Sequence, residues 1–198
     1  MKAAEMKAKP RKPGFVVEEF DVTGKDGKAH HVVFRYPRMP DIDQALKFVN
    51  ALMDEAEYIR LNKNITRKQE EKWLKEKLEK IAKREDVMIF VFVDGKLAGN
   101  VNAESHGGNS AHVGEIGISL REKYTGLGIG SRLLKAIEPE SRRVGFEVLR
   151  ISCYKGNKRA RHVYGNLKFK EIGIIPKARK RNGKYDDEVI MHKDIGTK

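Results

Sequence analysis

The chain has 198 residues, of which 39% are hydrophobic and 35% charged, and a formal net charge of +13. This length suits one domain with a full core, and the single cysteine, Cys153, excludes an internal disulfide. Because no apolar run approaches the roughly 20 residues that span a bilayer and no secretory leader pattern is present, we expect a cytoplasmic protein without a membrane partner.

The N-terminal residues predict a mobile segment followed by two strands. Residues 1–13 are basic and contain two prolines, so we expect a flexible tail before a single domain that covers residues 14–198. Residues 15–23 and 30–37 alternate in polarity as strands do, and Gly24–Gly27 between them indicates a tight turn.

Two helices are expected next. Asp41 and Gln44 have the spacing of a capping box, and apolar residues then recur at helical intervals up to Met53. Thr66 and Gln69 form a second such box, followed by an apolar stripe that contains Trp73 and Leu74. A connecting segment, residues 57–64, joins the two helices.

The remaining elements complete a mixed sheet. Strands are expected at residues 87–93, 97–103, 112–120, 146–152, 169–175 and 188–192. One helix should begin near Ile129 and kink or end at Pro139, and another should run from an Asn157 cap to about Leu167. The order β-β-α-α-β-β-β-α-β-α-β-β predicts an α+β fold, with a mixed, mainly antiparallel sheet flanked by about four helices.

The most informative segment joins a strand that ends at Leu120 to the helix near Ile129. Three glycines occupy alternate positions just before this helix: Gly126, Gly128 and Gly130. Glycine permits unusual backbone angles and lets an anion approach the main chain, so this arrangement predicts a site for a phosphorylated ligand. A glycine-rich turn without a ligand is the alternative.

Other phosphate-binding loops fit less well. A nucleotide-hydrolase loop requires Lys-Ser/Thr after its last glycine, whereas Ser131-Arg132 follows here. A dinucleotide fold requires Gly-x-Gly-x-x-Gly near the start of a βαβ unit, and this motif is Gly-x-Gly-x-Gly late in the chain. The catalytic His-Arg-Asp and Asp-Phe-Gly elements of a protein kinase are missing.

Three segments resemble the GNAT acetyltransferase superfamily, particularly its branch that acetylates ribosomal proteins and small amines. Thr125-Gly-Leu-Gly-Ile-Gly130 is similar to the acetyl-CoA loop Gln/Arg-x-x-Gly-x-Gly/Ala, with Thr125 replacing the usual first residue. Residues 157–169 resemble Asn-x-x-Ala-x-x-x-Tyr-x-x-x-Gly-Phe, with Lys168 in place of Gly. Residues 182–191 look like the closing hairpin of that branch, so the resemblance covers about residues 32–195.

The resemblance implies acetyl-CoA as cosubstrate. Its pyrophosphate would lie on the segment formed by Thr125, Gly126, Leu127, Gly128, Ile129, Gly130 and Ser131, with Arg132 beside it. Its pantetheine arm would follow the backbone of Ile118, Ser119 and Leu120, with further contacts from Asn157 and Tyr164. Arg159 and Arg161 are candidates for the coenzyme's phosphates.

An amine must lose a proton before it attacks, so a base is expected near the thioester. Glu115 is the first candidate, because burial in an apolar strand would raise its pKa and the family places a catalytic Glu there in some branches. His112 is the second, and Glu55 or Glu57 on the acceptor side are further options. Tyr164 has the family's general-acid position, and we favour that role over the alternative of an aromatic that only packs on the core.

We therefore expect an N-acetyltransferase that transfers acetyl to a primary amine, on a protein N-terminus, a lysine or a small molecule, by direct attack in a ternary complex. The alternatives are a non-catalytic acyl-CoA-binding module and a ribosome- or nucleic-acid-associated protein that uses the basic clusters at residues 7–12 and 177–181. No nucleic-acid motif is visible, so nucleic acid is not an expected partner. The six histidines lack metal-ligand spacing, so no metal is expected, and the protein should be a monomer or homodimer.

Overall fold

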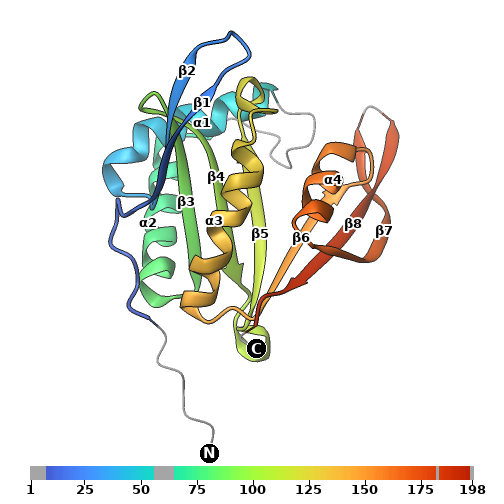
Figure 1. Ribbon diagram of the computed structural model, residues 1–198. Helices are drawn as coiled ribbons and strands as arrows, with labels where there is room; N and C mark the ends of the chain where they lie inside the picture. The colour runs from blue at the N-terminus through green and yellow to red at the C-terminus, as the bar shows by residue number, and fades with distance from the viewer. Residues whose placement is uncertain (1–7, 56–64, 182, 197–198) are drawn as a thin grey trace, which may run out of the picture.

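The computed structural model describes residues 8–55, 65–181 and 183–196, which form one eight-stranded sheet with four α-helices (Figure 1). The strands are β1 (Val16–Thr23), β2 (Ala29–Arg35), β3 (Asp86–Val93), β4 (Lys96–Ser105), β5 (Val113–Leu120), β6 (Val148–Tyr154), β7 (Lys170–Arg181) and β8 (Lys184–Asp194). The helices are α1 (Ile42–Glu55), α2 (Arg67–Lys83), α3 (Ile129–Val144) and α4 (Lys158–Asn166).

The sheet order is β1-β2-β3-β4-β5-β6-β8-β7. Neighbouring strands are antiparallel except β5 and β6, which are parallel. The predicted order of elements and the α+β, mainly antiparallel fold are therefore confirmed. None of the described helices combines the length and apolar character needed to cross a bilayer.

Helices cover both faces of the central strands. α1 and α2 pack on the face that carries Phe90 and Asn100, whereas α3 lies against β3, β4 and β5 on the opposite face (Figure 1). Every residue of β3 is buried, which explains its almost continuous apolar sequence, because a strand covered on both sides has no solvent-facing position.

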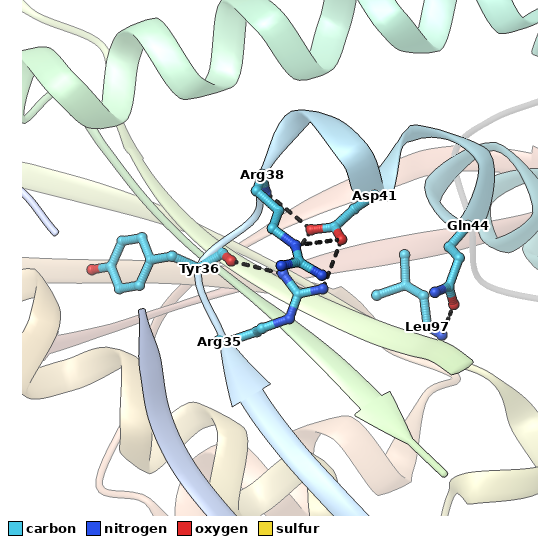
Figure 2. A network of polar contacts seen from close by, with 6 residues as sticks. All are labelled: Arg35, Tyr36, Arg38, Asp41, Gln44 and Leu97. Carbon is cyan, nitrogen blue, oxygen red and sulfur yellow. Dashed lines mark hydrogen bonds and ion pairs between the residues drawn. The ribbon is translucent and has the colours of Figure 1, made fainter. Parts of the chain in front are cut away.

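The predicted capping box at Asp41 and Gln44 is wrong. The Asp41 carboxylate accepts hydrogen bonds from the two terminal guanidinium nitrogens of Arg35, at 2.6 and 2.7 Å, and from Arg38. Gln44 instead accepts the backbone N–H of Leu97 at 2.9 Å (Figure 2). These two side chains attach the start of α1 to β2 and β4, because cations and a strand N–H offer them partners that the local sequence does not reveal.

α3 continues past Pro139 to Val144, so of the two expected outcomes, a kink or an end, the helix does not end there. A proline in a helix leaves the carbonyl four residues earlier without its usual donor. Here that carbonyl belongs to Lys135, and both Lys135 and Pro139 are outside the buried core, so water can satisfy it. The second predicted box is confirmed, since Thr66 caps α2 and bonds reciprocally with Gln69.

Part of the expected tail contacts the domain. Arg11 pairs with Glu140 of α3 at 2.7 Å, and the Tyr36 hydroxyl donates to the same carboxylate at 2.9 Å. The division of the chain at residue 13 stays a prediction. The predicted connection at residues 57–64, including Glu57, lies outside the described residues.

Candidate active site

The two parallel strands separate in the middle of the sheet. β5 and β6 are paired only from Val113 to Ile116 on β5, although β5 continues to Leu120. A cavity of 540 Å³ opens at this point. Its lining residues come from β4, β5, β6, α4 and the loop after β4: Asn100, Asn102, Glu104, His106, Glu115, Ile116, Gly117, Ile118, Ser119, Ile151, Ser152 and Tyr164.

The separation leaves backbone groups of β5 available for a ligand. The Arg121 N–H donates to Ala98 of β4, and the His112 carbonyl accepts from residues just before and at the start of β6. Because hydrogen-bonding direction alternates along a strand, Ile118 and Leu120 turn their N–H and C=O groups toward the gap, as His112 does. Ser119, the third residue predicted here, directs its backbone toward β4 and instead lines the cavity.

The glycine segment carries a row of backbone donors. None of the N–H groups of residues 126–131 donates to another described part of the chain, and bonding resumes at Arg132, whose N–H reaches the Gly128 carbonyl at 3.0 Å. Gly126 and Gly128 have φ of 86° and 79°, angles that a side chain disfavours. Six consecutive free donors at the start of α3 suit a pyrophosphate, which carries several acceptor oxygens.

Two of the predicted contact residues near this segment have other partners in the structure. The Thr125 hydroxyl donates to the Glu122 carbonyl at 2.6 Å, so it shapes the turn before the glycines. Arg132 pairs with Glu18 at 2.7 Å, and its guanidinium lies 3.6 Å from the centre of the Phe20 ring.

Two cations from distant elements approach the same glycines. A Cβ atom placed on Gly126 would lie 3.4 Å from a guanidinium nitrogen of Arg159, at the start of α4, and 3.8 Å from Cε of Lys25, in the β1–β2 turn. Neither forms an ion pair within the described ranges. Arg161, the other arginine considered, pairs with Glu171 at 2.7 Å and points elsewhere.

Glu115 lies on the polar wall of the cavity. It is opposite Glu104 in the β4–β5 ladder, and Arg150 of β6 donates to its carboxylate. Glu104 is occupied by Lys77 and Lys80, whose hydrogen bonds and charges lower its pKa despite the opposing effect of burial. His112 is exposed, precedes β5 and does not line the cavity.

Tyr164 forms part of the opposite wall. Its side chain is buried and packs against Phe169, with ring centres 6.2 Å apart. Burial raises the pKa of Tyr164, so the hydroxyl keeps its proton at neutral pH. Asn157 caps α4 by accepting the Ala160 N–H at 3.1 Å, as predicted, which fixes the helix that carries Tyr164.

A known protein family matches the part of the sequence that builds this site. The family model described as acetyltransferase (GNAT) family matches residues 48–169, which is more than half of the chain. The chain belongs to the GNAT family of acetyltransferases. The sequence resemblance is thereby confirmed, and as a GNAT enzyme the protein is an acetyl-CoA-dependent N-acetyltransferase.

Solved structures show the same fold. A GNAT acetyltransferase from Streptococcus pneumoniae has a TM-score of 0.76 at 22% identity, covering 82% of this chain and 99% of its own. A ribosomal-protein-alanine N-acetyltransferase from Brucella melitensis has a TM-score of 0.73 at 18% identity, covering 81% and 98%. A putative acetyltransferase from Salmonella typhimurium, solved with its cofactor acetyl-CoA, has a TM-score of 0.74 at 15% identity, covering 84% and 95%. No curated protein sequence matches significantly.

The cavity between β5 and β6 is also lined by residues that the sequence did not indicate as functional. Asn100, Asn102 and His106 line the same cavity as Glu115, and no motif indicated them. Glu55, a predicted acceptor-side option, instead pairs with Arg121, whose hydrogen bond lowers the pKa of Glu55. Glu55 is thereby held at the end of α1, away from the cavity lining.

Proposed function

We propose that this GNAT enzyme acetylates a primary amine by direct attack on bound acetyl-CoA, with Glu115 as proton acceptor and Tyr164 as proton donor. The main support is the combination of six free backbone donors, in the segment that follows β5, with a cavity that both of these side chains line. The free N–H groups would donate to the diphosphate of acetyl-CoA. The unpaired backbone of Ile118 and Leu120 would hydrogen-bond to the amides of the pantetheine arm, and the cavity would hold the thioester and the amine.

When bound, acetyl-CoA supplies an acetyl group activated as a thioester. Glu115 takes a proton from the acceptor's ammonium group, directly or through water, which frees the nitrogen lone pair. A backbone N–H of Ile118 or Leu120 donates to the thioester oxygen, an interaction that contributes about 3 kcal/mol in comparable oxyanion sites. The N–C bond forms as the C–S bond breaks.

Tyr164 donates its phenolic proton to the departing sulfur. The nitrogen loses its second proton to water as the amide forms, and water returns a proton to the Tyr164 phenolate, so the protons balance. The raised pKa of Tyr164 keeps the donor form populated throughout the physiological range. Glu115 releases its proton to solvent through the cavity. The proposal includes no covalent enzyme intermediate. The single cysteine, Cys153, is half-buried, and burial raises its pKa to about 11, so its thiol is not the reactive thiolate at neutral pH.

The test is an acetyl-CoA assay with panels of amines, read by thiol release and by mass of the product, together with calorimetric titration of acetyl-CoA. We expect binding, and amine-dependent thiol release that follows sequential kinetics. Tight binding without turnover over a broad panel would instead identify an acyl-CoA-binding module. Absence of binding at millimolar acetyl-CoA would overturn the proposal.

A further inference from the structure

A second cavity adjoins the first. It has a volume of 370 Å³ and lies between α1, α2 and the sheet. Asn100 and Ser119, which are partners in the β4–β5 ladder, line both cavities. A molecule in the second cavity therefore reaches the polar wall beside which the acetyl group is expected. The volume lies near the lower end of the range of about 300–1,000 Å³ for small-molecule sites.

The second cavity is mostly apolar but contains one acid. Its hydrophobic lining comes from α1, α2, β3 and the residue two positions before α2: Ala45, Phe48, Val49, Leu52, Ile65, Trp73 and Phe90. Among the described lining residues Glu70 is the only ionisable one, and the other polar side chain contributed by α2, Gln69, is occupied by the Thr66 cap. Glu70 is only 6% exposed.

Glu70 differs from the other buried carboxylates. Asp41, Asp86 and Glu140 each pair with Lys or Arg, but no cation or hydrogen-bond donor reaches the Glu70 side chain from any described residue. Burial without a partner raises the pKa of Glu70. An unpartnered buried acid is costly to the fold, so its presence in a cavity points to a ligand that supplies the missing donor.

Helix geometry explains how Glu70 reaches this position. Glu70, Leu74, Lys77 and Ile81 form the buried stripe of α2. Lys77 bonds to Asp86 and Glu104, whereas Glu70 lies two turns earlier and lines the second cavity together with Asn100. The next residue, Glu71, faces solvent and pairs with Arg67 at 3.3 Å.

We propose that the second cavity binds the acceptor, and that the acceptor is a primary amine on an apolar body about the size of one aromatic ring, with its ammonium group held by Glu70. This inference rests on the proposed acetyl transfer, since it names the acceptor class of the same site. The ammonium ion supplies the missing donors and charge, and the apolar body packs against Phe48, Leu52 and Trp73. Two sources share this chemistry: a free arylalkylamine and a peptide whose first side chain is aromatic.

Binding is tested by calorimetry with 2-phenylethylamine and its uncharged analogue 2-phenylethanol, on the whole protein with and without CoA. The wild type should bind the amine at least about tenfold more tightly than the alcohol, because a charge-assisted hydrogen bond is involved. Glu70→Gln should lose that preference while its Tm stays equal or rises, because an unpaired buried charge is removed. Glu71→Gln, the same change one residue away, should retain the preference.

Turnover gives the second measurement. For 2-phenylethylamine, kcat/KM should exceed that for ethylamine by at least about tenfold, since an apolar ring is buried. Glu70→Gln should raise the amine KM and leave the acetyl-CoA KM unchanged, and Val49→Phe, which fills the cavity, should affect 2-phenylethylamine more than ethylamine. A Phe-Gly-Gly peptide in place of the free amine distinguishes the two sources.

The outcomes separate this inference from the proposed function. Equal binding of amine and alcohol by the wild type, or an unchanged preference in Glu70→Gln, would overturn the acceptor assignment even if acetyl-CoA is bound and used. If the wild type does not bind acetyl-CoA at all, the proposal of acetyl transfer is overturned instead.

Discussion

At the scale of single residues, the two walls of the first cavity carry different chemistry. Glu115 is a part-buried carboxylate beside Arg150, and Tyr164 is a buried phenol packed against Phe169. The two side chains are 49 positions apart in sequence. They line the same cavity because β5 and β6 separate beyond Ile116 and α4 contributes Tyr164 to the lining.

Replacing Glu115 by Gln should lower kcat by about 10²-fold or more, since a proton acceptor is lost, while the acetyl-CoA KM stays within about twofold. Steady-state kinetics and thermal unfolding check this. Arg150→Gln breaks the same ion pair but keeps the carboxylate, so it is the matched control. If both variants lower Tm equally and neither lowers kcat, Glu115 is only a structural partner of Arg150.

Tyr164→Phe removes the hydroxyl and preserves the ring that packs on Phe169. We expect kcat to fall by about 10²-fold, with an unchanged circular dichroism spectrum and a Tm shift of only a few degrees. Because the pKa of Tyr164 is raised by burial, its ionisation should not contribute to the pH–rate profile below about pH 9. Unchanged kcat in this variant would assign Tyr164 to packing alone.

At the scale of elements, the entry to α3 depends on left-handed backbone geometry at particular glycines. Gly128 precedes the helix with φ of 79°, whereas Gly130 is inside the first turn, where an added Cβ atom would meet nothing within 4 Å. Both glycines belong to the same sequence motif, but only Gly128 has a backbone angle that disfavours a side chain.

Gly128→Ala should therefore destabilise the protein by about 1–2 kcal/mol, because a side chain is strained at this angle, and should raise the acetyl-CoA KM. Gly130→Ala should leave stability unchanged or raise it by about 0.5–1 kcal/mol, because alanine is the better helix former. Urea unfolding of the free protein measures both. Equal destabilisation by the two changes would contradict this account of the turn.

The start of α1 gives a prediction about pH. Burial opposes ionisation of Asp41, but the hydrogen bonds and charges of Arg35 and Arg38 outweigh it and lower its pKa. The ion pair therefore stabilises the fold fully above the unfolded-state pKa of about 3.9 and is lost as pH falls through the lower folded-state value. Asp41→Asn should reduce the free energy of unfolding by about 3 kcal/mol at pH 7.

The difference in stability between wild type and Asp41→Asn should begin to shrink below about pH 4, where the Asp41 carboxylate of the unfolded chain takes up a proton, and should vanish below the lower folded-state pKa. Chemical unfolding at pH 7 and pH 3 provides the comparison. Asp43→Asn is the control, because Asp43 lies two positions later, in the first turn of α1, and is an exposed residue that pairs with Arg67 at the surface. A constant difference across this range would refute the assignment.

At the scale of the whole molecule, the fold brings cations from both ends of the chain to the glycine segment. Lys25 comes from the first hairpin and Arg159 from the fourth helix. With a net charge of +13, the protein also attracts anions at long range. We expect the two local cations, Lys25 and Arg159, to affect the affinity for acetyl-CoA more strongly than the net charge does.

Lys25→Ala combined with Arg159→Ala should raise the acetyl-CoA Kd by about tenfold and reduce its dependence on salt concentration, because two local phosphate contacts are lost. Lys72→Ala combined with Lys75→Ala removes the same charge from the exposed face of α2 and should change Kd by less than about twofold. Calorimetry at low and high salt, from about 20 to about 500 mM, tests this. Equal effects of the two pairs would attribute binding to net charge alone.

The sequence by itself determined the class of fold, the order of its strands and helices, and the glycine segment. Those features follow from local periodicity, turn chemistry and backbone freedom, which each depend on residues close together in the chain. The Asn157 cap and the Thr66 box were likewise predictable, because their partners lie three residues away.

Only the tertiary structure decided which partners particular side chains have and which side chains line the two cavities. Asp41 and Gln44 do not form the expected capping box, because Asp41 pairs with Arg35 and Gln44 accepts the Leu97 N–H. Likewise, His106 lines the first cavity, whereas His112 does not. Glu70 and Glu71 are chemically identical neighbours, yet a rotation of about 100° between successive helical positions buries one and exposes the other. Such choices depend on packing between distant segments, which local sequence does not encode.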